Sequence, residues 1–143
     1  MDLDYGSEKS TLDDKGRIII PAIFREFFQG DLLLTYGVEK CAWIMTPAAW
    51  ERMKQEILNS KNLSPRERRL LEAKHLQQTQ KVELDKQGRI PVAFPIRKYA
   101  NLTKLCMVSR DSEKMSIWDF DSWYDYLAVN DEPAEDAFDK MGI

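Results

Sequence analysis

Few residues of this chain can carry out covalent or metal chemistry. Its 143 residues include one histidine and two cysteines. Neither Cys41 nor Cys106 has another metal ligand at a zinc-site spacing, and His75 has no nucleophilic or ligating partner at a recognisable spacing. Both standard patterns of glycine-rich phosphate loop are also missing. The sequence therefore predicts that the chain is not an enzyme and has no metal site, no cofactor and no small-molecule substrate.

Long apolar runs are absent as well. No run approaches the ~20 apolar residues that a membrane-spanning helix needs. The acidic residues near the start, Asp2, Asp4 and Glu8, are unlike the basic beginning of a signal peptide. These absences predict a cytoplasmic protein with no membrane partner. In a reducing compartment, Cys41 in a loop and Cys106 in an apolar segment are expected to be free thiols.

The chain also lacks an excess of positive charge, which argues against a nucleic-acid partner. Its net charge is −3, but residues 1–9 contribute −2 and residues 131–143 contribute −4, so residues 10–130 carry +3. The acidic ends are expected to be mobile. Because affinity for an anionic partner comes from local patches, the basic middle of the chain still allows such a partner.

What the sequence does contain is one stretch that occurs twice. Leu12–Arg25 and Leu84–Arg97 align with an offset of 72 residues, and the offset becomes 73 from Leu33 onward. Identical residues meet at the ends and the centre of the alignment, in the pairs Leu12/Leu84, Asp13/Asp85, Gly16/Gly88, Arg17/Arg89, Ile18/Ile90 and Arg25/Arg97. An internal repeat of this kind predicts one supersecondary unit built twice, in two halves of about seventy residues.

Each copy begins as a turn that leads into a short strand. Gly16 and Gly88 can adopt positive φ without steric cost, and an aspartate three residues earlier can accept backbone amides across the bend. The β-branched residues that follow predict strands over 17–20 and 89–92. Pro91 lacks an amide donor, so its strand is expected at a sheet edge. Short helices over 22–28 and 96–100 are expected to follow.

The remaining elements also occur in matched pairs. Apolar segments predict strands over 32–35 and 105–108, then over 42–45 and 115–118. Thr46 and Asp119 are good N-caps for the helices that follow. Ser64 and Glu67 have the spacing of a capping box, which predicts a helix in the connection between the halves. The predicted organisation is a first half over 5–58, a helical linker over 59–80, a second half over 81–130 and an acidic tail over 131–143.

Two interpretations of the repeated aspartate and arginine remain open. The Asp13/Arg17 and Asp85/Arg89 pairs could be ion pairs that only fix the turns, because a carboxylate and a guanidinium match well. Alternatively, each turn holds its arginine outward for phosphates or for guanine in the major groove. The arginines of the linker helix, Arg66, Arg68 and Arg69, are similarly compatible with a solvated helix face or with nucleic-acid contact.

These motifs resemble a known family. Asp-x-x-x-Arg occurring twice, with Gly-Arg-Ile-x-x-Pro at Gly16–Pro21 and Ile-Trp-Asp at Ile117–Asp119, is similar to MraZ, a family of bacterial transcriptional regulators of the division and cell-wall gene cluster. The halves of that family are related to the DNA-binding domain of AbrB and SpoVT. The resemblance covers roughly residues 10–129. The second copy departs from it, because Pro91 and Pro95 replace the single proline found at Pro21.

The resemblance implies a fold and a site. The implied fold is mainly β with short helices (α+β), a pseudo-dimeric swapped-hairpin β-barrel of the AbrB/SpoVT type. Both arginine turns would lie on one face, and the chains would assemble into a homo-oligomeric ring. The implied DNA-binding residues are Lys15, Arg17, Lys86 and Arg89, together with Arg25 and Arg97, which could instead serve the turn or an interface. The implied turn-shaping residues are Asp13, Gly16, Asp85 and Gly88.

The resemblance also implies a function. Such a protein would bind direct repeats in the double-stranded DNA upstream of its own operon, and would repress that operon as a nucleoid-associated regulator. Two alternatives remain: an AbrB-like antitoxin, which normally carries a single copy and a disordered toxin-binding tail, and an assembly module that does not bind DNA.

Overall fold

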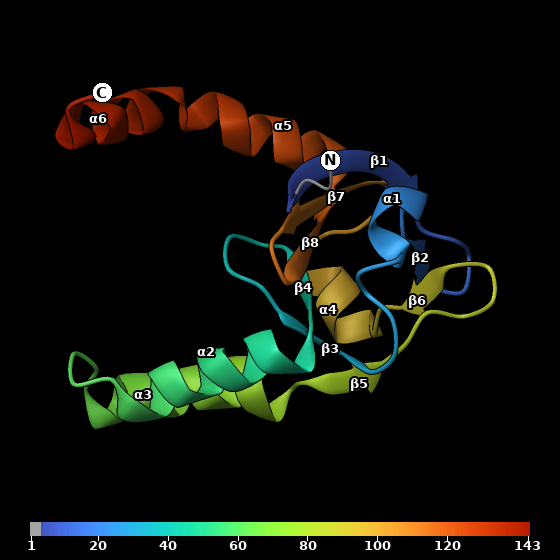
Figure 1. Cartoon of the computed structure of the whole chain (residues 1–143), viewed down its shortest axis with the longest axis horizontal. Coiled ribbons are helices and arrows are strands. Elements are labelled where there is room, and N and C mark those ends of the chain that lie inside the picture. The colour runs from blue at the N-terminus through green and yellow to red at the C-terminus, as the bar shows by residue number, and fades with distance from the viewer. Residues whose placement is uncertain (1–3) are drawn as a thin grey trace.

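The strands of the chain form two antiparallel sheets. The computed structural model describes residues 4–143, so Asp2 of the acidic start lies outside the described residues. Within that range the chain is mainly β with short helices, and the predicted fold class is confirmed (Figure 1). The larger sheet has the order β1 (Tyr5–Thr11), β7 (Leu105–Asp111), β8 (Lys114–Asp119), β4 (Ala42–Met45), β3 (Leu32–Tyr36), β5 (Gln80–Val82). The smaller sheet pairs β2 (Arg17–Ile19) with β6 (Arg89–Pro91).

The two halves exchange strands. β1 of the first half pairs with β7 of the second, and β5 of the second half pairs with β3 of the first. At the centre, β4 pairs with β8. Reciprocal backbone hydrogen bonds join the turns: Ile20 N–H donates to Gly88 O at 2.8 Å, and Val92 N–H donates to Gly16 O at 2.9 Å. Each half therefore needs the other to satisfy its backbone groups.

The small sheet places apolar side chains inward and arginines outward. Ile18 and Ile90 are directly paired and fully buried. Because successive side chains in a strand point to opposite faces, Arg17 and Arg89 lie together on the other face. Pro91 is on a strand that pairs only with β2 within residues 4–143, as expected for an edge. The core that supports this sheet consists of Ile18, Ile20, Phe24, Phe28, Leu32, Leu34, Ala42, Ile44, Val82, Ile90, Val92, Ile96, Cys106, Val108, Met115 and Ile117.

The expectation of a mobile N-terminal segment is wrong for the part that the structure describes. Residues 5–11 form β1, which pairs along its whole length with β7. The segment is polar because it is an edge strand with mostly exposed side chains. Its partner lies about a hundred residues away, so no local pattern indicated the pairing.

The helices begin where their capping residues predict. Thr46 caps α2 (Pro47–Asn59) by accepting from Ala49 N–H, and Asp119 caps α5 (Phe120–Val129) by accepting from Ser122 N–H. The predicted capping box of Ser64 opens α3 (Pro65–Leu71), which continues as a π-helix over Glu72–Gln77. The two short helices are α1 (Ala22–Arg25) and α4 (Phe94–Tyr99).

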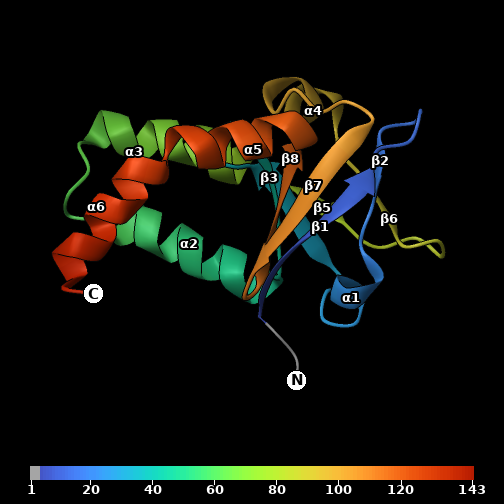
Figure 2. The ribbon, with the colours of Figure 1, turned by 90° about the horizontal axis from the view of Figure 1, so that it is seen from above.

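The acidic tail is a helix, an element that its sequence did not predict. It forms α6 (Asp131–Met141), which ends at Gly142 with φ 74°. Acidic residues in the first turn favour the helix through its dipole, and the glycine allows the left-handed end. The α5–α6 and α2–α3 segments both project from the sheets on the side away from β2 and β6 (Figures 1 and 2). Among residues 4–143, no helix combines the length and the apolar character needed to span a membrane.

Candidate nucleic-acid interface

The two turns have the same hydrogen-bond geometry. Asp13 Oδ1 accepts from the backbone N–H groups of Lys15 at 3.0 Å and Arg17 at 2.9 Å. Asp85 Oδ1 accepts in the same way from Gln87 and Arg89, both at 2.9 Å. The glycines have φ of 78° and 77°. A side-chain acceptor and a left-handed glycine thus define each bend.

The other carboxylate oxygen of each aspartate holds an arginine. Arg17 Nε lies 2.8 Å from Asp13 Oδ2, and Arg89 Nε lies 2.8 Å from Asp85 Oδ2. Arg89 Nη1 is also 3.6 Å from Asp13 Oδ2, so the two arginines approach the same carboxylate. The arginine side chains are 29% and 23% exposed. Each guanidinium is therefore fixed at Nε, while part of it faces solvent.

Both turns project from the same end of the molecule. Figure 2 shows them beyond β2 and β6, at the end opposite the long helical segments. Lys15 and Lys86 are exposed at the tips of the turns. They occupy different positions, because Lys15 corresponds to Gln87 in the second copy and Lys86 corresponds to Asp14 in the first. The structure thus brings Lys15, Arg17, Lys86 and Arg89 to one surface.

The arginines of the short helices lie against the turns. Arg25 Nε donates to Ile20 O at 2.7 Å, and Arg97 Nη1 donates to Val92 O at 2.6 Å. Each guanidinium also covers the glycine of the opposite half: a Cβ on Gly16 would lie 2.0 Å from Arg97 Nη1, and one on Gly88 would lie 2.3 Å from Arg25 Nε. Arg25 and Arg97 thus support the turns. The repeated motif contains both arginines, but only the tertiary structure shows which turn each one contacts.

Because of the two turn aspartates, the free energy of unfolding should decrease at acid pH. The backbone N–H of Arg17 donates to Asp13 and lowers its pKa below the ordinary 3.8, and the N–H of Arg89 has the same effect on the pKa of Asp85. Because the pKa of each aspartate is lower in the folded state than in the unfolded state, the charged carboxylates stabilise the fold at pH values above the unfolded-state pKa of about 3.8. This contribution is lost as the pH falls from about 3.8 through the folded-state pKa.

We therefore expect the wild-type chain to lose more free energy of unfolding between about pH 5 and about pH 3 than an Asp13→Asn/Asp85→Asn double variant. Urea denaturation at several pH values measures both curves. Other carboxylates titrate in both proteins, so only the difference between the curves reports on the turns. Parallel curves would contradict the assignment of these two aspartates as charged turn acceptors.

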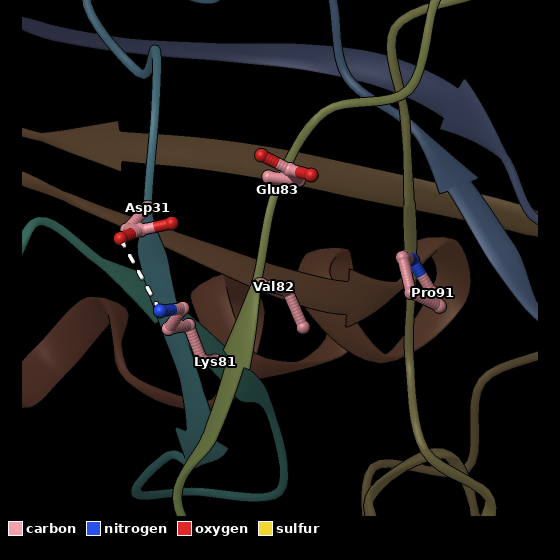
Figure 3. Close-up of a pocket in the computed structure, with 5 residues that line it drawn as sticks. All are labelled: Asp31, Lys81, Val82, Glu83 and Pro91. Atoms are coloured by element: carbon pink, nitrogen blue, oxygen red, sulfur yellow. Dashed lines mark ion pairs between the residues drawn. The ribbon is translucent and has the colours of Figure 1, made fainter.

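A cavity beside the interface distinguishes the two halves. In the first half, Ser10 hydroxyl donates to Ile19 carbonyl and joins β1 to β2. The equivalent residues of the second half, Val82 and Pro91, cannot form this bond, and a cavity of about 300 Å³ lies there. Asp31, Lys81, Val82, Glu83 and Pro91 line it (Figure 3). Its lysine is paired with Asp31 at 3.5 Å. The cavity therefore adds no unpaired basic side chain to the surface of the turns.

Within residues 4–143, no three histidine, cysteine or acidic side chains lie together as a metal site would require.

A match to a known family covers both halves of the duplicated chain. A family model described as "MraZ protein, putative antitoxin-like" matches residues 5–73 and 76–141, which correspond to the two copies of the repeat. Together the two segments cover nearly all of the sequence. The chain therefore belongs to the MraZ family.

Proposed function

We propose that this chain is a sequence-specific DNA-binding transcriptional regulator that represses its own division and cell-wall gene cluster. The observation that supports this most is the pair of arginines, Arg17 and Arg89, held by aspartates on one outward face. A regulatory role is consistent with membership of the MraZ family.

DNA binding explains the repeated aspartate–arginine pairs better than a contribution to stability does. Exposed ion pairs contribute only ~0–1 kcal/mol, which is a weak reason to build the same pair twice. Asp13 and Asp85 fix each arginine at Nε, so the terminal guanidinium nitrogens have little remaining freedom. Those of Arg89 also lie 3.1 Å from Gln87 Oε1 and 3.6 Å from Asp13 Oδ2, contacts that a bound duplex would replace. Such a group can bind phosphate oxygens or form two hydrogen bonds with guanine O6 and N7. Lys15 and Lys86 at the tips add phosphate contacts.

Assembly of several copies would raise the affinity for DNA above what one small contact surface provides. We propose that several copies form a ring, as the family resemblance implies, through head-to-tail contacts that close. One ring would then present many pairs of turns to direct repeats in the promoter. Linked sites bind with a high effective concentration, so modest individual affinities multiply. Repression follows when the bound ring blocks RNA polymerase on the nucleoid.

An antitoxin function is the second candidate, because the family description itself uses that term. A toxin-binding segment would have to be exposed. The α6 helix meets this condition, since Phe138 is 55% and Met141 is 69% exposed. An assembly module that does not bind DNA is the third candidate, and the DNA titration below separates it from the first.

Gel-shift titration with the duplex upstream of the protein's own gene tests the proposal. Binding through about four phosphate contacts would make the affinity fall about a hundredfold between ~50 and ~200 mM salt, because bound lysines and arginines release counterions. A scrambled duplex of equal length is the control for sequence specificity. Affinity that does not respond to salt, or that is equal for both duplexes, contradicts the proposed function.

A further inference from the structure

The helix α6 is exposed along its whole length. Its 11 residues include no buried side chain, and Phe138 and Met141 are 55% and 69% exposed. In the first half, α2 packs beside α3, whereas α6 extends outward from α5 and does not return to the sheets (Figure 1). An isolated helix shorter than ~12–15 residues is marginal in water. We therefore expect a partner to stabilise α6.

The sequence of α6 shows what kind of partner it suits. Ala134, Phe138 and Met141 follow one another at spacings of four and three residues, so they share one face of the helix. A row of acids spaced four residues apart borders this apolar face: Asp131, Glu135 and Asp139. Among residues 4–143, no cation forms an ion pair with these acids. A partner that matches α6 would have apolar side chains beside positive charge.

The linker between the two halves has such a surface. An open groove of about 520 Å³ lies beside α3 and the π-helix, and it is lined by Tyr36, Leu70, Ala73, Lys74 and Gln78. We call it the α3 groove. Leu70 is 52% exposed, and Lys74 Nζ lies 5.7 Å from the centre of the Tyr36 ring. A cation–π contact holds an ammonium group without neutralising it, so the groove combines apolar side chains with a positive charge.

Two arginines of α3 add to this charge. Arg66 precedes Leu70 by four residues and Arg69 precedes Ala73 by four, so each lies next to a groove residue along the helix. Both arginines are exposed, and neither forms an ion pair within residues 4–143. Residues 61–74 contain five lysines and arginines and two glutamates, so they carry +3, whereas residues 131–143 carry −4. The two surfaces are therefore complementary in charge, and each has an apolar part.

We propose that α6 of one copy of this chain binds in the α3 groove of the next copy. This inference rests on the proposed assembly and names its two contact surfaces. Because α6 and the α3 groove are different surfaces, the contact is head-to-tail, which is the kind that can close into a ring. Both surfaces belong to the segments that project away from β2 and β6 (Figures 1 and 2). Assembly through them leaves the turns free to contact DNA.

Reversal of the charges on either surface tests the contact. Arg66→Glu/Arg69→Glu and Glu135→Lys/Asp139→Lys each place like charges across the proposed interface, so each should weaken the association of full-length chains at least about tenfold. Sedimentation velocity without DNA, over a range of protein concentrations, measures the association. All four side chains are exposed, so both double variants should keep the circular dichroism spectrum of the wild type.

Two combinations of these variants should restore assembly. A chain with all four substitutions has the charges of both surfaces exchanged, so opposite charges face each other again. In an equimolar mixture of the two double variants, the acidic α6 of one variant meets the unchanged groove of the other, and the basic α6 meets the acidic groove. The mixture can assemble only through contacts between different chains, so its rescue distinguishes them from a contact within one chain.

The matched control is Glu8→Lys/Glu26→Lys, which reverses two exposed acids on β1 and at the end of α1 and should assemble as the wild type does. Wild-type association of both double variants would leave α6 to another partner, such as a toxin, and would overturn the contact but not the ring. Assembly of the four-substitution chain but not of the mixture would place α6 in the groove of its own chain, which also overturns it. A monomeric wild-type chain would overturn the contact and the proposed ring together, while the gel-shift titration tests DNA binding separately.

Discussion

Arg17→Ala and Arg89→Ala should each weaken binding to the promoter duplex by about 5- to 150-fold. A well-placed arginine that forms two hydrogen bonds with a base contributes about 1–3 kcal/mol of discrimination, and the carboxylates of Asp13 and Asp85 already orient these two side chains. Because both arginines lie on one face, the double variant should lose most specific binding. Anisotropy titrations with promoter and scrambled duplexes measure the affinity and the specificity separately.

The control for these variants is Arg52→Ala, which removes an arginine paired with Glu113 and located on α2. It should bind DNA as the wild type does. Circular dichroism and size-exclusion chromatography should show an unchanged fold and oligomeric state for Arg17→Ala and Arg89→Ala, because both side chains are partly exposed. If either variant kept an affinity within about twofold of the wild type, its arginine would be only a structural ion-pair partner.

Gly16→Ala and Gly88→Ala should destabilise the fold by about 2–4 kcal/mol each. Alanine at positive φ costs about 1–2 kcal/mol. The new Cβ would also displace the guanidinium of Arg97 or Arg25, and a hydrogen bond to a charged group is worth about 1.5–3 kcal/mol. The guanidinium is the end of a flexible side chain, so part of this second cost can be relieved. Urea denaturation gives the free energies.

Gly30 provides the matched control for the glycine variants. It has a φ of 73°, but nothing lies within 4 Å of the position that its Cβ would occupy. Gly30→Ala should therefore cost only the conformational term of about 1–2 kcal/mol. If Gly16→Ala cost no more than Gly30→Ala, the contact between the short-helix arginine and the opposite turn would not contribute to stability.

Local chemistry made much of the fold predictable. The duplicated motif indicated two turns with glycine at positive φ, and the apolar segments indicated the strands of each half. Thr46, Ser64 and Asp119 marked the helix starts correctly, because N-capping depends on residues within one turn of the helix. The mainly β class followed from these elements.

Pairings between distant segments were not predictable in this way. β1 and β5 were missed because their side chains are largely polar or the segments are short, and each is stabilised by a strand of the other half. The expectation of a mobile N-terminal end failed at β1, and the helix α6 was not predicted. At the turns, the family resemblance left Arg25 and Arg97 open between DNA contact and support of the turn or an interface, and the fold places them against the opposite glycines.

The sequence by itself determined that two equivalent bends exist, each with an aspartate, a glycine and an arginine, because residues within five positions of one another form them. Only the tertiary structure decided that Arg17 and Arg89 share one face and that Arg89 reaches Asp13. It also decided that Lys40 and Lys74 both lie against the ring of Tyr99 at the end of α4. These residues come from separate segments, and the packing of the strands against the common core sets their distances.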